Sequence, residues 1–278
     1  MKTILVTGGC GFIGSHTCLE LLRLDYNIIV IDSNINSTDI SLKKISEIRY
    51  LQDKVLSDNL TFFKADIRNK ELIEHIFCES IRKKKRIEAV VHFAGLKAVR
   101  KSMEDPLLYW ENNVYGSLVL LQVMQKFNCL NMVFSSSATV YGLSSQVNLT
   151  EDSELKPNNP YGETKLAVEK ILNDIFKSSN QKWRIANLRY FNPIGAHSSG
   201  LIGENPNGIP DNLFPYICMV ASGNLSHLNI FGNDWPTFDG TCVRDYIHVM
   251  DLAESHRCAL EYLFNNKPQI LSLNIGTG

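Results

Sequence analysis

Short runs of hydrophobic, often β-branched residues recur along the chain, and each is followed by a segment with a helical pattern. Strands that are buried on both faces of a parallel sheet have this near-continuous apolar character. Because the runs alternate with helical segments, the pattern predicts βαβ units and a doubly wound, Rossmann-type α/β fold. The predicted strands lie at residues 4–6, 28–31, 60–63, 89–93, 132–134, 183–188 and 272–275.

Residues 192–242 have a different pattern, in which Gly, Pro and Asn interrupt the apolar runs. Such residues mark loops. Ligands of open α/β sheets bind at the carboxyl ends of the strands, so we expect this region to form part of a smaller, irregular substrate-binding lobe there. Residues 1–191, with contributions from about 243–278, are then expected to form the dinucleotide-binding domain.

Composition narrows the possible partners. The 278 residues carry a formal net charge of −1, which gives no general reason to expect a nucleic acid or an anionic membrane. No apolar run approaches the roughly 20 residues of a membrane span. The apolar start of the chain runs directly into glycines, which predicts a strand rather than a secretory signal. The basic run 82–86 is expected to cap a helix C-terminus, with a nuclear or nucleic-acid role as the alternative.

The seven cysteines are an odd number, are scattered and form no CxxC pair. This usage is typical of reduced thiols in the cytoplasm rather than of a disulfide framework. Neither the cysteines nor the seven histidines show the spacing of a metal site, so no metal is expected.

Three glycines follow the first predicted strand with a GxxGxxG spacing: Gly8, Gly11 and Gly14. Glycine allows a tight turn and lets backbone N–H groups approach a pyrophosphate at the start of the next helix, predicted at 12–24. Asp32 ends the second strand, where a carboxylate accepts hydrogen bonds from ribose hydroxyls and repels a 2′-phosphate, which favours NAD over NADP. The alternative for Asp32 is a turn residue.

Further candidate contacts lie at the ends of the next strands. Asp66 and Ile67 follow the third strand, where they can meet the adenine edge; a helix N-cap for the segment starting near Asn69 is the alternative for this position. Phe93, Ala94 and Gly95 follow the fourth strand, where small residues let the backbone approach a cofactor, and Lys97 lies just beyond.

A tyrosine and a lysine four residues apart open the helix predicted at 161–177. Tyr161 and Lys165 would share one helix face, which fits either a chance surface pair or an acid–base pair. Ser137 follows the fifth strand and would reach the same edge of the sheet. The joint pattern behind a dinucleotide loop favours the acid–base pair.

The motifs together resemble a known family. TGGCGFIGSHT, HFAGLKAV, FSSSATVYG, PYGETK, LRYFNPIGAH and VRDYIHVMDLA make the chain similar to the extended short-chain dehydrogenase/reductase family over essentially its whole length. More narrowly, the chain is similar to the UDP-glucose 4-epimerases of that family. Related nucleotide-sugar dehydratases tend to carry an acidic pair at the positions of Ala138 and Thr139, so its absence argues against dehydration.

The resemblance implies a redox-neutral interconversion of UDP-glucose and UDP-galactose, in which sugar C4 is oxidised by NAD and reduced again on its other face. Tyr161 would act as general base toward the 4-hydroxyl, although an unperturbed phenol has a pKa near ~10. Lys165 and the positive nicotinamide would favour the phenolate. Ser137 would hydrogen-bond and position the reacting oxygen.

Two sets of candidate site residues result. The candidates for NAD are Gly8, Gly11, Phe12, Ile13, Gly14, Asp32, Ser33, Asn34, Asn36, Ser37, Asp66, Ile67, Phe93, Ala94, Gly95, Lys97, Asn112, Ser137, Tyr161, Lys165 and Phe191. The candidates for the UDP-sugar are Ser137, Thr139, Tyr161, Asn192, Asn212, Leu213, Asn229, Ile230, Phe231 and Arg244. An ion pair with Asp245 or Asp251 is the alternative for Arg244, and bonds to loop backbone are the alternative for Asn229.

The resemblance also implies a homodimer through helices near 106–127 and 161–177, although one face of each helix must pack on its own sheet. The sequence ends at LSLNIGTG, where the family continues with a stretch that completes the sugar-binding lobe. We therefore expect a shortened isoform or an incomplete gene model, and a non-catalytic NAD-binding chain is an alternative to the epimerase, as is a dehydratase or reductase. Arg100 and Lys101 stand where the family has Gly and Glu.

Overall fold

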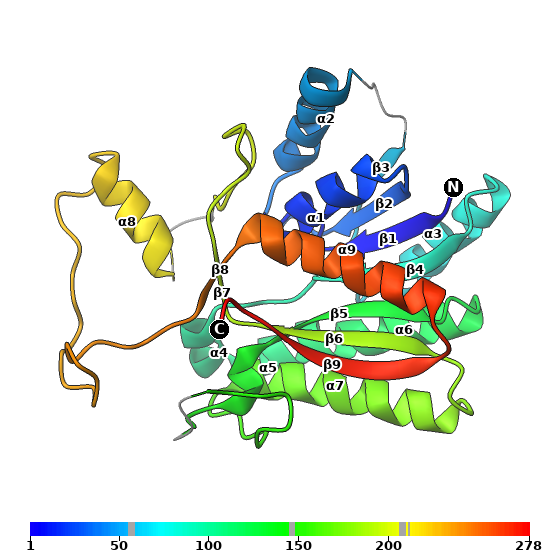
Figure 1. Cartoon of the computed structure of the whole chain (residues 1–278). Coiled ribbons are helices and arrows are strands. Elements are labelled where there is room, and N and C mark those ends of the chain that lie inside the picture. Colours follow the sequence, from blue (N-terminus) through cyan, green and yellow to red (C-terminus); the bar gives the residue numbers. More distant parts are fainter. Residues whose placement is uncertain (55–58, 145–147, 206–209, 211) are drawn as a thin grey trace.

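A seven-stranded parallel sheet forms the centre of the molecule (Figure 1). The computed structural model describes residues 1–54, 59–144, 148–205, 210 and 212–278. The strand order is β3-β2-β1-β4-β5-β6-β9, and all neighbouring strands are parallel. The seven predicted strands are confirmed, with bounds β1 Thr3–Thr7, β2 Asn27–Asp32, β3 Leu60–Lys64, β4 Ile87–His92, β5 Asn131–Ser137, β6 Arg184–Tyr190 and β9 Gln269–Ile275.

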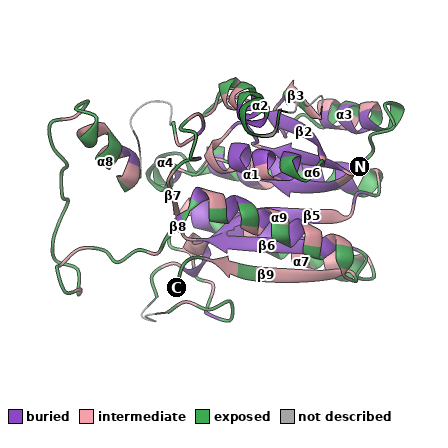
Figure 2. Ribbon diagram, turned by 45° about the horizontal axis from the view of Figure 1, so that its top comes forward, coloured by how far each residue is buried: buried purple, intermediate pink, exposed green. Residues whose placement is uncertain are grey.

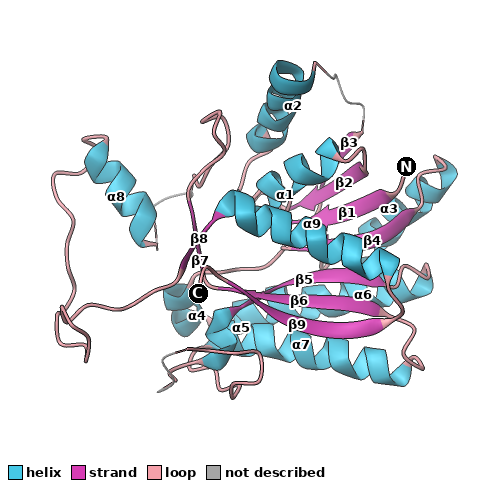
Figure 3. Ribbon diagram, viewed as in Figure 1, coloured by secondary structure: helices cyan, strands magenta, loops and turns pink. Residues whose placement is uncertain are grey.

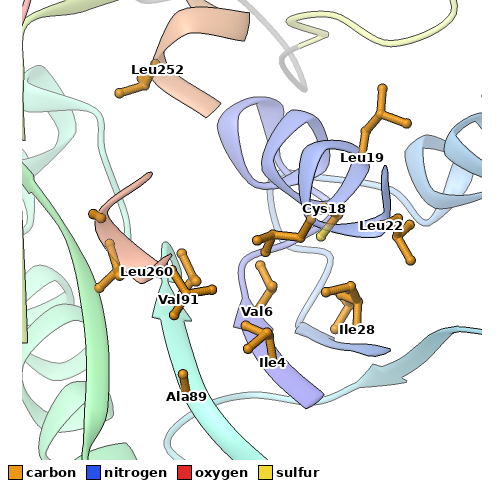
Figure 4. Packing of buried hydrophobic residues seen from close by; sticks show 14 of the residues in the cluster. Ile4, Val6, Cys18, Leu19, Leu22, Ile28, Ala89, Val91, Leu252 and Leu260 are labelled. Atoms are coloured by element: carbon orange, nitrogen blue, oxygen red, sulfur yellow. The ribbon is translucent and has the colours of Figure 1, made fainter. Parts of the chain in front are cut away.

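Helices cover both faces of the sheet, which confirms the doubly wound architecture. Alternate residues of a strand point to opposite faces, so Ile4 and Val6 pack with Leu19 and Leu22 of one helix layer, while Leu5 packs in the other core. Figure 4 shows the first of these cores. The helices are α1 Phe12–Arg23, α2 Ile40–Asp53, α3 Lys70–Arg82, α4 Val99–Glu104, α5 Pro106–Tyr109, α6 Gly116–Lys126, α7 Pro160–Ser178, α8 Leu213–Ala221 and α9 Val249–Asn265.

The sheet contains a topological switch point, where a ligand site is expected. The chain adds β2 and β3 on one side of β1 and then crosses to β4 on the other side. The carboxyl ends of β1 and β4 therefore open a crevice between oppositely directed connections, as in other open α/β sheets.

The helix expected at 106–127 is divided into three parts. A π-helical segment, Trp110–Tyr115, separates α5 from α6. Single wide turns of this kind are rare and are often found at functional sites. The basic run behaves as expected, because Arg82 lies in the last turn of α3 and Lys83 caps its C-terminus.

Helix α8 and the connection that follows it extend away from the sheet (Figures 1 and 3), whereas Ile202 and Ile247 of the same region are buried in the core. Residues 192–248 also contain a parallel pair that the sequence pattern did not predict, β7 (Asn192–Ile194) with β8 (Tyr246–His248). Figure 2 shows that the long connection between α8 and β8 is largely exposed, in contrast to the buried sheet. None of the helices in the described residues has the length and apolar content needed to cross a bilayer.

Candidate active site

The glycine loop after β1 packs closely against the backbone of the turn after β4 and against its own backbone. Gly8 has φ +71°, and a Cβ on it would lie 2.7 Å from the amide nitrogen of Ala94. A Cβ on Gly14 would lie 2.3 Å from the carbonyl oxygen of Gly8. Gly11 is the N-cap of α1 and contributes no side chain. The first N–H groups of this 12-residue helix therefore have no side-chain cap, which fits a pyrophosphate.

Asp32 organises the end of β2. Its Oδ2 accepts the N–H of Cys10 at 3.0 Å, and its Oδ1 accepts the N–H of Asn34 at 2.9 Å and the hydroxyl of Ser37 at 2.8 Å. Asn34 adopts a left-handed conformation at φ +57°. Asp32 is thus both a turn residue and an acceptor aimed at the glycine loop. A carboxylate has further lone pairs for ribose hydroxyls, so these residues fit the adenosine half of NAD.

The positions after β3 are held by other contacts. Asp66 pairs with Arg68 at 2.6 Å, which lowers the pKa of its carboxyl. The N-cap alternative for Asp66 is wrong, because Asn69 accepts the N–H of Leu72 and caps α3. Ile67 packs on Gly116, where a Cβ would come within 2.7 Å of its side chain.

The turn after β4 is held by Asn113, which the sequence analysis missed. Its Oδ1 accepts the N–H of Leu96 at 2.8 Å, and its Nδ2 donates to the carbonyl of Leu96 at 3.0 Å and to Thr164 at 3.0 Å. The predicted neighbour Asn112 instead donates to the carbonyl of Leu108. The π-helical turn shifts the helix face by a residue, which an uninterrupted helical pattern does not anticipate.

A buried polar chain lies beneath this turn. His92 contacts Thr7 at 2.6 Å and Ser117 at 2.9 Å, and Thr7 also accepts the N–H of Ala94 at 3.3 Å. Burial, and to a lesser extent the charge of Lys165, lower the pKa of His92 to about 3. The imidazole is therefore neutral and supports the turn without adding charge.

The structure brings Ser137, Tyr161 and Lys165 together at the carboxyl edge of β5. Asn159 caps α7 by accepting the N–H of Gly162, and Pro160 occupies its first turn, so Tyr161 lies at the helix start. The Lys165 Nζ is 5.9 Å from the centre of the Tyr161 ring. Ser137 hydrogen-bonds to Tyr161. All three residues are buried, so the alternative of a chance surface pair is wrong.

Burial sets the protonation of this pair. It raises the pKa of Tyr161 to about 12, against a smaller lowering by the hydrogen bond with Ser137. It lowers the pKa of Lys165 to about 8, against a smaller raising by Glu169. The pair is therefore a phenol beside an ammonium near pH 7. A positive charge placed next to Tyr161 would lower the phenol pKa toward the working range of a base.

Two predicted residues from different regions meet through one carboxylate, that of Glu204. Lys97 pairs with Glu204 at 2.9 Å, and Asn212 donates to the same Glu204 oxygen at 3.1 Å. This contact joins the turn after β4 to the start of α8. Separately, the Oγ1 of Thr139, after β5, is buried and has no hydrogen-bond partner among the residues that the structure describes.

The remaining substrate candidates are not assembled into a site. Asn192 donates to the carbonyl of Asp245, whose carboxylate accepts hydrogen bonds from Thr277 rather than from Arg244. Arg244 donates to the carbonyl of Val243. Leu213, Asn229, Ile230 and Phe231 are exposed. Part of the loop before α8, residues 206–209 and 211, lies outside the described residues.

Comparisons with known proteins identify the family of the chain. The family model "NAD dependent epimerase/dehydratase family" matches residues 4–276. UDP-glucose 4-epimerase of Bacillus subtilis (strain 168) is 51% identical over 275 residues, which are 99% of this chain and 77% of the relative. The crystal structure of UDP-glucose 4-epimerase from Bifidobacterium longum, in complex with NAD+ and UDP, is 44% identical with a TM-score of 0.90, over 99% of this chain and 78% of that one.

A second solved structure gives the same likeness. It is UDP-glucose-4-epimerase from Stenotrophomonas maltophila, with bound NAD and formylated UDP-arabinopyranose. It is 43% identical with a TM-score of 0.91, over 100% of this chain and 79% of that one.

Proposed function

The chain belongs to the NAD-dependent epimerase/dehydratase family, and from this premise we propose that it interconverts UDP-glucose and UDP-galactose. The observation that carries the proposal is the buried meeting of Ser137, Tyr161 and Lys165 beside a glycine loop that fits a dinucleotide. Relatives and solved structures named UDP-glucose 4-epimerase support the choice of reaction. The chain is therefore proposed to be an isomerase of galactose metabolism.

Each residue of the pair has a defined task in this reaction. NAD, when bound, supplies the chemistry of accepting a hydride from sugar C4 and returning it to the other face. Tyr161 takes the proton of the 4-hydroxyl and later gives it back, which general acid–base catalysis makes worth roughly 10²–10⁴-fold in rate. Lys165 supplies a fixed positive charge beside the phenol, and Ser137 holds the reacting oxygen by a hydrogen bond.

The contacts to cofactor and substrate remain proposals. The glycine loop and Asp32 are assigned to NAD, together with the other positions that the sequence analysis named. Asn192, Asn212 and Arg244 are assigned to the diphosphate, for which amide and guanidinium donors are suited. Asn229, Ile230 and Phe231 are assigned to the uracil. Ala138 and Thr139 provide no acidic pair, which favours epimerisation over dehydration.

We also infer a homodimer in the cytoplasm. The segment from α4 to α6 leaves a group of large apolar side chains exposed, which supports a second copy as partner: Met103, Leu107, Trp110 and Tyr115. All seven cysteines lie in described residues and are free, which supports a reducing compartment.

The test is conversion of UDP-galactose to UDP-glucose by the purified chain without added NAD. Turnover is expected, because a redox-neutral cycle leaves the cofactor unchanged and lets it co-purify. Tyr161→Phe should lower the rate roughly 10²–10⁴-fold while bound NAD is retained. Tyr262→Phe is the matched control, because Tyr262 is exposed on α9. A folded, NAD-loaded chain without turnover would reject the epimerase and favour the non-catalytic alternative.

A further inference from the structure

Three consecutive serines end β5, and only Ser137 has a task in the proposed reaction. Ser135, Ser136 and Ser137 are all buried, at 3%, 0% and 7% exposure. Side chains alternate along a strand, so Ser136 points to the face opposite Ser135 and Ser137. A fully buried hydroxyl needs a hydrogen-bond partner, and the partner of Ser136 lies on the catalytic helix.

That partner is Glu169, which also holds a buried arginine. The Oε1 of Glu169 accepts the hydroxyl of Ser136 at 2.5 Å and the Nε of Arg189 at 3.0 Å, while its Oε2 accepts Nη2 of Arg189 at 2.7 Å. The side chains of Arg189 and Glu169 are 5% and 6% exposed. This bidentate geometry leaves the carboxylate little freedom to rotate.

The spacing along α7 links this group to the chemistry. Tyr161, Lys165 and Glu169 stand at i, i+4 and i+8 and therefore share one helix face. Each is tied to a different serine of β5. Ser137 bonds to Tyr161, the carbonyl of Ser135 accepts Nζ of Lys165 at 2.6 Å, and Ser136 donates to Glu169.

Stability alone is a poor explanation for this buried pair. The cost of removing two charges from water commonly offsets their attraction, so apolar residues of equal volume are often as stable. Arg189 is satisfied further by Tyr141 at 3.0 Å and by the carbonyl of Glu151 at 3.2 Å. A fully satisfied polar network instead fixes one arrangement of the elements it joins.

We propose that Ser136, Glu169 and Arg189 form a positioning unit that fixes α7 against β5 and β6, so that Tyr161 and Lys165 meet the substrate in register. The unit touches neither substrate nor cofactor in this assignment, and it acts through Lys165. The inference rests on the proposed function, since it concerns the pair that performs the acid–base step.

The unit also supplies the counter-charge of Lys165. The titratable groups that interact with Lys165 are Tyr161 and Glu169 on α7 and His92 on β4. On β6, Arg189 contacts Glu169, and Tyr190 interacts with Tyr161. Glu169 is the group that raises the pKa of Lys165. Without its charge, the unpaired Arg189 would oppose the ammonium, so Lys165 would lose its proton at lower pH.

The first test is Ser136→Ala, which deletes one hydroxyl and leaves the Glu169–Arg189 pair in place. We expect kcat to fall roughly 10- to 100-fold with KM within about twofold, because small misplacements of reacting groups have effects of this order. Ser80→Ala is the matched control. Ser80 is also buried and bonds to a backbone carbonyl at 2.7 Å, far from the pair. Equal kcat in both variants would overturn the proposal.

Glu169→Gln removes the charge but keeps the shape. The alkaline limb of its pH–rate profile should move to lower pH by about one to three units, the size expected for losing a close opposite charge. Glu169→Asp, which restores the charge on a shorter side chain, should recover the limb. An unshifted limb with reduced thermal stability would show a merely structural role.

A readout without turnover separates the two proposals. ¹⁵N NMR of the lysine ammonium groups follows the titration of Lys165 directly in wild type, Ser136→Ala and Glu169→Gln. We expect the titration midpoint of Lys165 to fall by about one to three pH units in Glu169→Gln. A smaller fall is expected in Ser136→Ala. If wild type does not epimerise, the proposed function fails while this titration still tests the unit. If Lys165 titrated at the same pH in wild type and in both variants, the proposed positioning unit would be rejected.

Discussion

The region around Tyr161 and Lys165, where α7 packs on β5, differs from the connection between α8 and β8 in burial and in the range of its hydrogen bonds. Around the pair, hydrogen bonds join residues far apart in sequence, such as Ser136 to Glu169, and Lys165 is 5% exposed. In the connection, the hydrogen bonds found are local, such as that between Trp235 and Gly240. Phe231 is 92% exposed there.

This contrast shows which half of the proposed site is built in advance. The residues proposed for NAD and for the acid–base step lie on or against a sheet that is packed on both faces, so their positions are set by the core. The uracil candidates stand on a segment that contributes little buried surface. If this segment binds UDP as proposed, binding would bury it, and the free energy of ordering its side chains would lower the affinity for UDP rather than the stability of the fold.

The largest expected effect is acid destabilisation of the sheet half. Burial lowers the pKa of His92 to about 3 and those of His16 and His256 to about 4. The unfolded chain takes up these protons near pH 6.5, whereas the folded chain does not. Stability is therefore present above pH 6.5 and is lost as the pH falls toward 4, by about 4 kcal/mol per unit near pH 5.

Urea unfolding at pH 7, 6 and 5 measures this slope. His256→Phe, which keeps an aromatic ring against Phe93 and Tyr190, should reduce the slope by about a third, since it removes one of the three titrations. A stability that does not change between pH 7 and 5 would contradict the buried, neutral state of these histidines.

The next effect comes from a methyl group in the glycine loop. In Gly14→Ala the new Cβ would lie 2.3 Å from the carbonyl oxygen of Gly8, so backbone must move. We expect the free energy of unfolding to fall by about 3 kcal/mol and the variant to lose its bound NAD. Gly200→Ala is the control in the extended region. Gly200 has φ +69° with nothing within 4 Å, so only left-handed strain of about 1 kcal/mol is expected and NAD is retained.

A smaller effect, of opposite sign, is expected at Lys165. Burial lowers the pKa of Lys165 to about 8 from 10.5, so below pH 8 the charged form disfavours folding by about 3 kcal/mol. Lys165→Met should abolish turnover yet raise the free energy of unfolding at pH 7 by about 2 kcal/mol, after loss of the bond to Ser135. The gain should shrink as the pH rises from 8 toward 10.5, because wild type then sheds the penalty. If the difference in denaturant midpoint between Lys165→Met and wild type were the same at pH 7 and pH 9.5, this prediction would be wrong.

The same contrast explains what could be predicted from the sequence. The five inner strands are buried and have near-continuous apolar runs. The edge strands β3 and β9 are partly exposed, but they also carry apolar runs, so all seven strands are predicted. Tyr161 and Lys165 were found because helical spacing is a local rule. Asn113 was missed because its contact depends on a π-helical turn that leaves no clear signal in one sequence.

Contacts between residues far apart in the sequence could not be predicted for another reason. Glu169 and Arg189 meet only once α7 lies on β6, and no spacing within the chain encodes that contact. The β7–β8 pair joins residues more than fifty positions apart through three-residue strands, which are too short to show a pattern. Boundaries between the dinucleotide domain and the substrate lobe remain a prediction.

The smallest effect on stability is expected at the exposed aromatic of the proposed uracil site. Phe231→Ala removes a ring that is 92% exposed, so the free energy of unfolding should change by less than about 0.5 kcal/mol. Phe77→Ala is the matched control, because Phe77 is 1% exposed and its loss should cost about 3–5 kcal/mol. Binding should reverse this ranking. Titration calorimetry should show that Phe231→Ala weakens UDP roughly tenfold, as expected when an aromatic contact to a base is removed, whereas an unchanged affinity would remove Phe231 from the site and leave the exposed connection without a role in binding.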